Sequence, residues 1–138
     1  VEDNPFMQFG RKWEPFIARW VQAETGILHS TWLIASADDP TFAATPDGLA
    51  LDHTLTAEIK TSGKPLDKVP AQYRRQVQWQ LFVTGAEKCA FTWFLRGEDF
   101  QPAELEPHMQ WIGRDEKEIK RLITVAERLR ETLCLDSI

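Results

Sequence analysis

Apolar side chains recur at three- and four-residue steps over the first 25 positions of the chain, which is the spacing of one helix face. Asn4 suits the capping position of such a helix, and Pro5 suits its first turn. Gly26 is expected to end it. The apolar face of this predicted helix is formed by Phe6, Phe9, Trp13, Phe16, Ile17 and Trp20.

Shorter apolar runs with turn residues between them predict strands after this helix. The first three are expected over residues 27–37, 42–51 and 53–62, the second interrupted by the sequence PDG. A second helix is expected from Pro70 to Gly85, and a continuous apolar run predicts a buried strand over residues 88–95.

The last expected element is a helix with one apolar stripe. That stripe comprises Ile112, Ile119, Leu122, Ile123, Ala126, Leu129 and Leu133. The predicted order is therefore α-β-β-β-α-β-α, which indicates a mixed central β-sheet flanked by helices, of the α/β (α+β) class. A chain of 138 residues that is 43% hydrophobic and has no internal repeat is expected to form a single domain over residues 1–138.

The composition excludes several classes of protein. Cys89 and Cys134 are too few for a disulfide framework or a four-thiolate metal centre, and such sparse cysteine is typical of a reducing compartment. No run reaches the roughly eighteen apolar residues of a membrane-spanning helix, and the first residues lack the pattern of a signal peptide. We therefore expect a cytoplasmic protein without a membrane partner.

The charge distribution is uneven. The net charge of −5 argues against a nonspecific nucleic-acid coat protein, which would be basic. Residues 60–75 reverse this balance, because they contain one acidic residue, Asp67. The basic residues of this segment are Lys60, Lys64, Lys68, Arg74 and Arg75. We expect this segment to contact a polyanion.

Two carboxylates and one ammonium fall on neighbouring predicted strands. Side chains alternate along a strand, so Glu58 and Lys60 share one face while Ile59 faces the other. A hairpin return places Asp47 beside Glu58. Adjacent carboxylates repel unless they share a cation, and Mg²⁺ prefers oxygen ligands, among which the main-chain carbonyl of Ile59 is a further candidate. With Lys60 orienting the attacking water, the group suits phosphodiester hydrolysis.

Both helices offer further side chains to this predicted site. Glu14 lies one helical turn from Gly10 and can reach the metal directly or through water, although a solvated helix carboxylate fits its position equally well. The second helix carries a polar stripe suited to water and phosphate, formed by Gln72, Tyr73, Gln76 and Gln80. An exposed polar face explains that stripe as well. Because a Glu-x-Lys triplet also arises by chance, the hypothesis depends on the combination.

Most aromatic residues have a simpler explanation. Trp13 and Trp20 fit the core face of the first helix, and Trp93 fits a buried strand. Trp32 is left without an assignment, as are the remaining tryptophans. His53 is the one histidine within reach of the predicted metal, and it is assigned no role.

Four segments occur in an order and spacing that resembles the lambda-type phage exonucleases, also called YqaJ-like viral recombinases. They are FGRKWEPFIARWVQAETG, TPDGL, EIK and YRRQVQWQLFVTG. The resemblance extends from about Gly10 to Phe94, and the segment GRDEKEIKRLI is similar as well. This family belongs to the PD-(D/E)XK nuclease superfamily, so a restriction-endonuclease-like core is implied.

The resemblance implies a role for each matching residue. These roles are metal carboxylates for Asp47 and Glu58, catalytic lysine for Lys60, acidic residue of the first helix for Glu14, site-lining helix motif for Gln76 with Tyr73, and a position near the bound phosphate for Thr45. Family members degrade linear double-stranded DNA from the 5′ end with Mg²⁺, for which Mn²⁺ is expected to substitute. They often form ring-shaped homotrimers and leave a 3′ single strand for an annealing protein, in a bacterial or phage-infected cell.

One departure from the family leaves the function open. Related nucleases usually carry an additional N-terminal segment that holds the 5′ phosphate, whereas nine residues precede Gly10 here. We therefore expect either a minimal version or a chain that lacks this segment. The leading hypothesis is a 5′–3′ exonuclease, and the alternatives are a structure-specific or restriction-type endonuclease and a non-catalytic DNA-binding module of the same fold.

Overall fold

The computed structural model describes residues 3–136, and its first element is the predicted helix α1 (Pro5–Thr25). The side chain of Asn4 accepts a hydrogen bond of 2.9 Å from the Met7 N–H, which satisfies one of the free amides of the first turn. Gly26 ends the helix at a φ of 78°, in the left-handed region that favours glycine. The prediction of this helix and of both its ends is confirmed.

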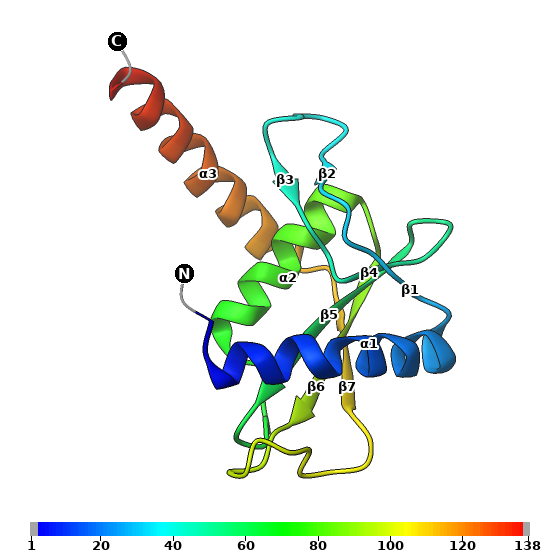
Figure 1. Cartoon of the computed structure of the whole chain (residues 1–138). Coiled ribbons are helices and arrows are strands. Elements are labelled where there is room, and N and C mark those ends of the chain that lie inside the picture. The colour runs from blue at the N-terminus through cyan, green and yellow to red at the C-terminus, as the bar shows by residue number, and fades with distance from the viewer. Residues whose placement is uncertain (1–2, 137–138) are drawn as a thin grey trace.

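A five-stranded mixed sheet forms the middle of the molecule (Figure 1). Its strand order is β1 (Leu28–His29), β4 (Gly48–Leu49), β5 (Leu55–Ser62), β6 (Lys88–Leu95) and β7 (His108–Gly113). The long central strands β5 and β6 are parallel, and the other neighbours are antiparallel. A parallel pair requires a crossover, and helix α2 (Ala71–Thr84) supplies it.

Helices α1 and α2 cover opposite faces of this sheet. Alternate residues of β6 divide between two apolar clusters: Ala90 and Phe94 pack with α1, whereas Cys89 and Phe91 pack with α2. This alternation is what a strand buried on both faces requires. Three layers result, with β5 at their centre, and the mixed sheet flanked by helices is the architecture that the sequence predicts.

A two-stranded sheet and the last helix extend beyond these layers. Strands β2 (Ile34–Ala35) and β3 (Ala43–Ala44) pair with each other beside α2, where the indole of Trp79 donates to the carbonyl of Ala43 at 3.1 Å. Helix α3 (Glu116–Asp136) projects away from the sheet (Figure 1). Arg130 ties α3 to the β2–β3 hairpin through Asp39 at 2.5 Å. No helix within residues 3–136 is long and apolar enough to cross a bilayer.

Several predicted boundaries are wrong. Residues 27–37 form two short strands in different sheets, and residues 42–51 are likewise divided between β3 and β4. The chain bends between these strands to reach both sheets, which an apolar run does not reveal. Strand β7 was not predicted, because Ile112 also fits a helical spacing with Ile119. Ile112 lies on β7, and the final helix begins at Glu116.

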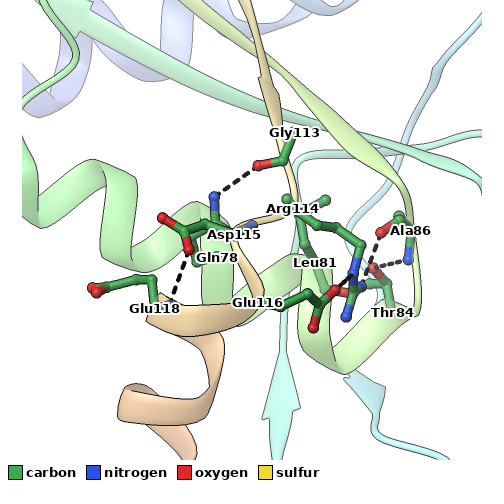
Figure 2. Close-up of polar contacts among 9 residues, drawn as sticks. All are labelled: Gln78, Leu81, Thr84, Ala86, Gly113, Arg114, Asp115, Glu116 and Glu118. Atoms are coloured by element: carbon green, nitrogen blue, oxygen red, sulfur yellow. Dashed lines mark hydrogen bonds and ion pairs between the residues drawn. The ribbon is translucent and has the colours of Figure 1, made fainter.

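A polar junction joins α2 to the turn between β7 and α3 (Figure 2). The buried Gln78 side chain donates to the Gly113 carbonyl and accepts from the Asp115 N–H, both at 2.9 Å. Arg114 donates to the carbonyls of Leu81 at 2.8 Å and Ala86 at 3.1 Å. The Leu81 carbonyl lies in the last turn of α2, where a cation is favourable, and Ala86 follows the helix by two residues. The junction therefore fixes α2 along the sheet.

Candidate active site

The candidate site lies where strand β5 loses its partner on one side. Strand β4 pairs with Thr56 and Ala57, and among residues 3–136 no strand continues this pairing along the rest of β5. Asp47 occupies this open edge, immediately before β4. Its Oδ2 accepts a hydrogen bond of 2.8 Å from the Ile59 N–H, and its own N–H donates to the Ala57 carbonyl at 3.1 Å. The carboxylate is thereby fixed against β5.

Gly48 explains why the sequence PDG is needed here. A Cβ at position 48 would lie 2.9 Å from both the Ala57 Cβ and the Ile27 Cγ2, closer than side chains pack. Glycine therefore lets β4 fit between β1 and β5. The sequence PDG predicts a turn that interrupts a strand, whereas Gly48 begins strand β4, which holds Asp47 in place.

Glu58 is the most enclosed member of the site, at 4% exposure. Two amides of α2 donate to it, Gln80 to Oε2 at 2.7 Å and Gln76 to Oε1 at 3.3 Å. The ammonium of Lys60 lies 3.3 Å from Oε1. Glu58 and Lys60 face the α2 side of the sheet together, as the strand alternation predicts.

The surroundings of Glu58 oppose its ionisation when no cation is bound. Burial raises the pKa of its carboxyl from 4.5 to about 7, and the nearby Asp47 carboxylate acts in the same direction. The hydrogen bond from Gln80 and the charge of Lys60 lower the pKa in part. A divalent cation at this edge would offset the remaining repulsion.

Lys60 is positioned between a carboxylate and an aromatic ring. Its Nζ lies 4.7 Å from the ring centroid of Tyr73, which projects from the first turn of α2. The side chain of Lys60 is 23% exposed, so its ammonium is held by neighbours and still reaches the solvent side. A ring face attracts a cation and restricts where it moves.

Glu14 completes the site from the other helix. It lies on α1 and, with Asp47, Glu58 and Lys60, lines a pocket of about 260 Å³. Gly10, one turn before Glu14, also lines this pocket, beside Thr61 of β5. All four predicted acidic and basic groups therefore meet around one pocket.

Oxygen atoms at this pocket suit a hard divalent cation, although within residues 3–136 no three Asp, Glu, His or Cys side chains lie close enough together to form a complete metal cluster. Asp47 and Glu58 supply carboxylate oxygens, and Glu14 is a third carboxylate at the same pocket. In an extended strand the N–H and C=O of one residue project from the same edge, so the Ile59 carbonyl faces the open edge with its N–H. Such an oxygen set suits Mg²⁺. Glu14 also lies 3.6 Å from the His29 Nε2, a contact that the sequence did not suggest.

The predicted DNA-contacting residues lie outside this pocket. The side chains of all five are exposed, and none lines it: Thr45, Lys64, Lys68, Arg74 and Arg75. One further contributor was underestimated. Gln80 was assigned to a polar stripe that an exposed face would explain, yet it is 3% exposed and bonded to Glu58. A glutamine among apolar residues on a helix was the available signal.

These layers and this edge define the class of protein. A mixed sheet between helices, with two carboxylates and a lysine along the open edge of its long central strand β5, is the PD-(D/E)XK nuclease fold. The model of the YqaJ-like viral recombinase domain matches residues 1–87, more than half of the chain. The chain therefore belongs to the YqaJ-like viral recombinase family.

Solved structures agree with this assignment. LHK-Exo in complex with dAMP is 28% identical, with a TM-score of 0.72 over 99% of this chain and 75% of that one. LHK-Exo is an alkaline exonuclease from Laribacter hongkongensis. A phage-related exonuclease from Haemophilus somnus 129PT shares the fold at 15% identity and a TM-score of 0.70, over 100% of this chain and 76% of that one. A sequence comparison with curated proteins gives no significant match.

Proposed function

We propose that this protein is a Mg²⁺-dependent deoxyribonuclease that degrades linear double-stranded DNA in the 5′–3′ direction during phage-type recombination. One observation carries the proposal: Glu14, Asp47, Glu58 and Lys60 meet around a single pocket in a chain whose relatives are exonucleases. The dAMP bound by LHK-Exo is a mononucleotide of the kind that exonucleases release. Mn²⁺ is expected to replace Mg²⁺, because it accepts the same oxygen ligands.

Each residue has a defined task in the proposed reaction. Asp47, Glu58, the Ile59 carbonyl and Glu14 would hold the cation, which when bound lowers the pKa of a water and offsets charge on the phosphate. The ammonium of Lys60 would orient the attacking water and stabilise the charge that develops on the phosphoryl oxygens. Tyr73 restrains Lys60 through its ring, while Gln76 and Gln80 hold Glu58 by hydrogen bonds.

The substrate would approach along exposed basic side chains. Lys64 and Lys68 lie between β5 and α2, and Arg74 and Arg75 lie on the first turns of α2, beside Tyr73. Cations in such positions bind the phosphate backbone irrespective of sequence. Thr45 precedes the site by two residues and would contact the phosphate near the cleaved bond. A homotrimer and a single-strand annealing partner complete the proposal on the basis of the family.

Topology tests the proposal, because an exonuclease needs a DNA end and an endonuclease does not. Linear and covalently closed plasmid are incubated together with the protein and Mg²⁺. We expect the linear form to be consumed, the closed form to survive, a 5′ hydroxyl to slow the reaction and EDTA to stop it. Equal loss of both forms would establish an endonuclease instead. Loss of neither, with binding retained, would establish a non-catalytic DNA-binding module.

A further inference from the structure

A second hollow adjoins the candidate active site and plays no part in the chemistry above. It has a volume of about 430 Å³ and lies along edge strand β1, between the loop after β1 and the turn after β4. We call it the Trp32 groove. Its principal lining residues are His29, Ser30, Trp32, Leu49, Leu51 and His53. The volume falls within the range of small-ligand pockets.

The groove lies next to the candidate active site. His29 lines the groove and lies 3.6 Å from Glu14, which lines the catalytic pocket. The Ser30 N–H donates to the Asp47 carbonyl at 2.9 Å, so the loop that carries Trp32 starts at the metal-site residue. The groove and the catalytic pocket are therefore neighbours, with His29 and Glu14 in contact between them.

Two apolar side chains of the groove are strongly exposed. Trp32 is 69% exposed and Leu51 is 86% exposed, although both line the same hollow. The Trp32 N–H donates a hydrogen bond of 3.2 Å to the Ser30 Oγ. Scattered exposed apolar residues are ordinary, whereas an indole and a leucine around one hollow form a binding surface.

The chemistry of the lining suits the base of a nucleotide rather than its phosphate. None of the nine lining residues is lysine, arginine, aspartate or glutamate, so the groove lacks the fixed cations that bind phosphate. It combines an exposed indole face with hydroxyl and imidazole groups, namely Ser30, Thr31, His29 and His53. An unpaired base matches this lining, because it has an apolar face that stacks on aromatic rings and a polar edge that forms hydrogen bonds.

We propose that the Trp32 groove binds an unpaired base of the DNA strand that enters the catalytic pocket, with that base stacked on Trp32. The proposal rests on the proposed nuclease function and extends it. Stacking in the groove would hold the end of the strand away from its complement while the adjacent phosphodiester lies beside Asp47 and Lys60. The preferred substrate is then a duplex whose 5′ strand is unpaired at its end.

The test compares a tail with bases and a tail without them. Duplex DNA with a short 5′ thymidine tail, or with the same tail made abasic, is titrated with protein in Ca²⁺, and binding is followed by fluorescence anisotropy. Alanine substitution of base-stacking aromatics typically costs about 1–3 kcal/mol, so Trp32→Ala should weaken binding of the thymidine tail roughly 5- to 150-fold. It should leave binding of the abasic tail unchanged, and Trp32→Phe should retain most of the affinity.

Matched variants control for exposure and residue type. Trp111, 38% exposed on β7, and Leu105, 93% exposed, lie outside the groove. Trp111→Ala and Leu105→Ala should therefore bind both tails as the unaltered protein does, whereas Leu51→Ala should weaken binding of the thymidine tail. Equal loss on both tails for Trp32→Ala, or no loss, would overturn the proposal. The oligomeric state of Trp32→Ala is measured by sedimentation. A changed oligomeric state without a change in base discrimination would also overturn the proposal and establish a protein interface.

Cleavage is measured on the same preparations with Mg²⁺. This measurement separates the base-binding proposal from the nuclease proposal on which it rests. If the unaltered protein cleaves DNA and Trp32→Ala keeps the base preference, the base-binding proposal alone is wrong. If base discrimination depends on Trp32 and no cleavage occurs, the groove proposal stands and the nuclease proposal is wrong.

Discussion

Gln80 donates its side-chain N–H to the Oε2 of Glu58 over 2.7 Å, and both side chains are buried. The bond joins helix α2 to strand β5 beneath the candidate metal site. A hydrogen bond to a carboxylate favours its charged form and so opposes the burial that raises the pKa of Glu58. Gln80 thereby keeps an enclosed carboxylate available for a cation.

Gln80→Leu should weaken metal binding in a pH-dependent way. Without this hydrogen bond the pKa of Glu58 rises further, so protons compete with the metal over a wider pH range. The Mg²⁺ concentration for half-maximal cleavage should increase several-fold at pH 6 and much less at pH 9. Gln72→Leu, exposed on the same helix, is the matched control and should behave normally. An equal increase at both pH values would contradict this role.

Glu58→Gln should stabilise the metal-free protein at alkaline pH. The folded state raises the pKa of Glu58 from 4.5 to about 7, so stability present below pH 4.5 is lost as the pH rises through 7. At 1.36 kcal/mol per pKa unit, removing the charge gains at most about 3 kcal/mol above pH 8 and nothing at pH 4. Urea unfolding in EDTA measures the difference, with the exposed Glu106→Gln as control. A Glu58→Gln protein less stable at pH 8 would refute the prediction.

Much of the fold could be predicted because the periodic pattern is long where the elements are long. Helix α1 shows its helical spacing over many residues, strand β6 is a long continuous apolar run, and both were placed correctly. The two-residue strands β1 to β4 are too short to show a period, and their pairing depends on contacts across the chain. Strand β7 is an edge strand with mostly exposed side chains, so its pattern is weak.

The candidate site, like the fold, could be predicted only in part. Asp47, Glu58 and Lys60 were chosen from strand alternation and from the resemblance, and the structure brings them together. The burial of Gln80 was not predicted, because glutamine on a helix is usually solvated and its apolar neighbours are a weak signal. Nor was the Trp32 groove, since it forms between two loops that meet only through the pairing of β1 with β4.

Arg114→Ala should destabilise the fold by about 2 to 3 kcal/mol. Arg114 donates to the carbonyls of Leu81 and Ala86, and loss of hydrogen bonds from a charged group costs about 1.5–3 kcal/mol. Its side chain is 28% exposed. Arg121 pairs with Glu118 at 64% exposure, so Arg121→Ala should cost less than about 1 kcal/mol. Denaturant unfolding compares the two variants, and equal losses would exclude the junction as the cause.

Asp47→Ala, Glu58→Ala and Lys60→Ala should each reduce cleavage of linear DNA at least about a hundredfold, the usual effect of removing a charge-stabilising group. EDTA should abolish activity, and Ca²⁺ should bind without supporting turnover. Lys88→Ala is the matched lysine control. Lys88 is the first residue of the neighbouring strand β6 and lies against Trp111, away from the candidate site. A Lys60→Ala protein with a near-normal rate would exclude the proposed mechanism.

Arg74→Ala and Arg75→Ala should weaken DNA binding more than they slow the chemical step. Both side chains are exposed on α2 and neither lines the catalytic pocket, so their contribution is to the phosphate backbone. The slope of log affinity against log salt is negative, and the loss of one phosphate contact should reduce its magnitude by about 0.9, uniformly across DNA sequences. Arg128→Ala on α3 is the control for an exposed arginine away from the site. An unchanged slope for Arg74→Ala and Arg75→Ala would show that the DNA follows another face of the protein, because counterion release counts the contacts actually made.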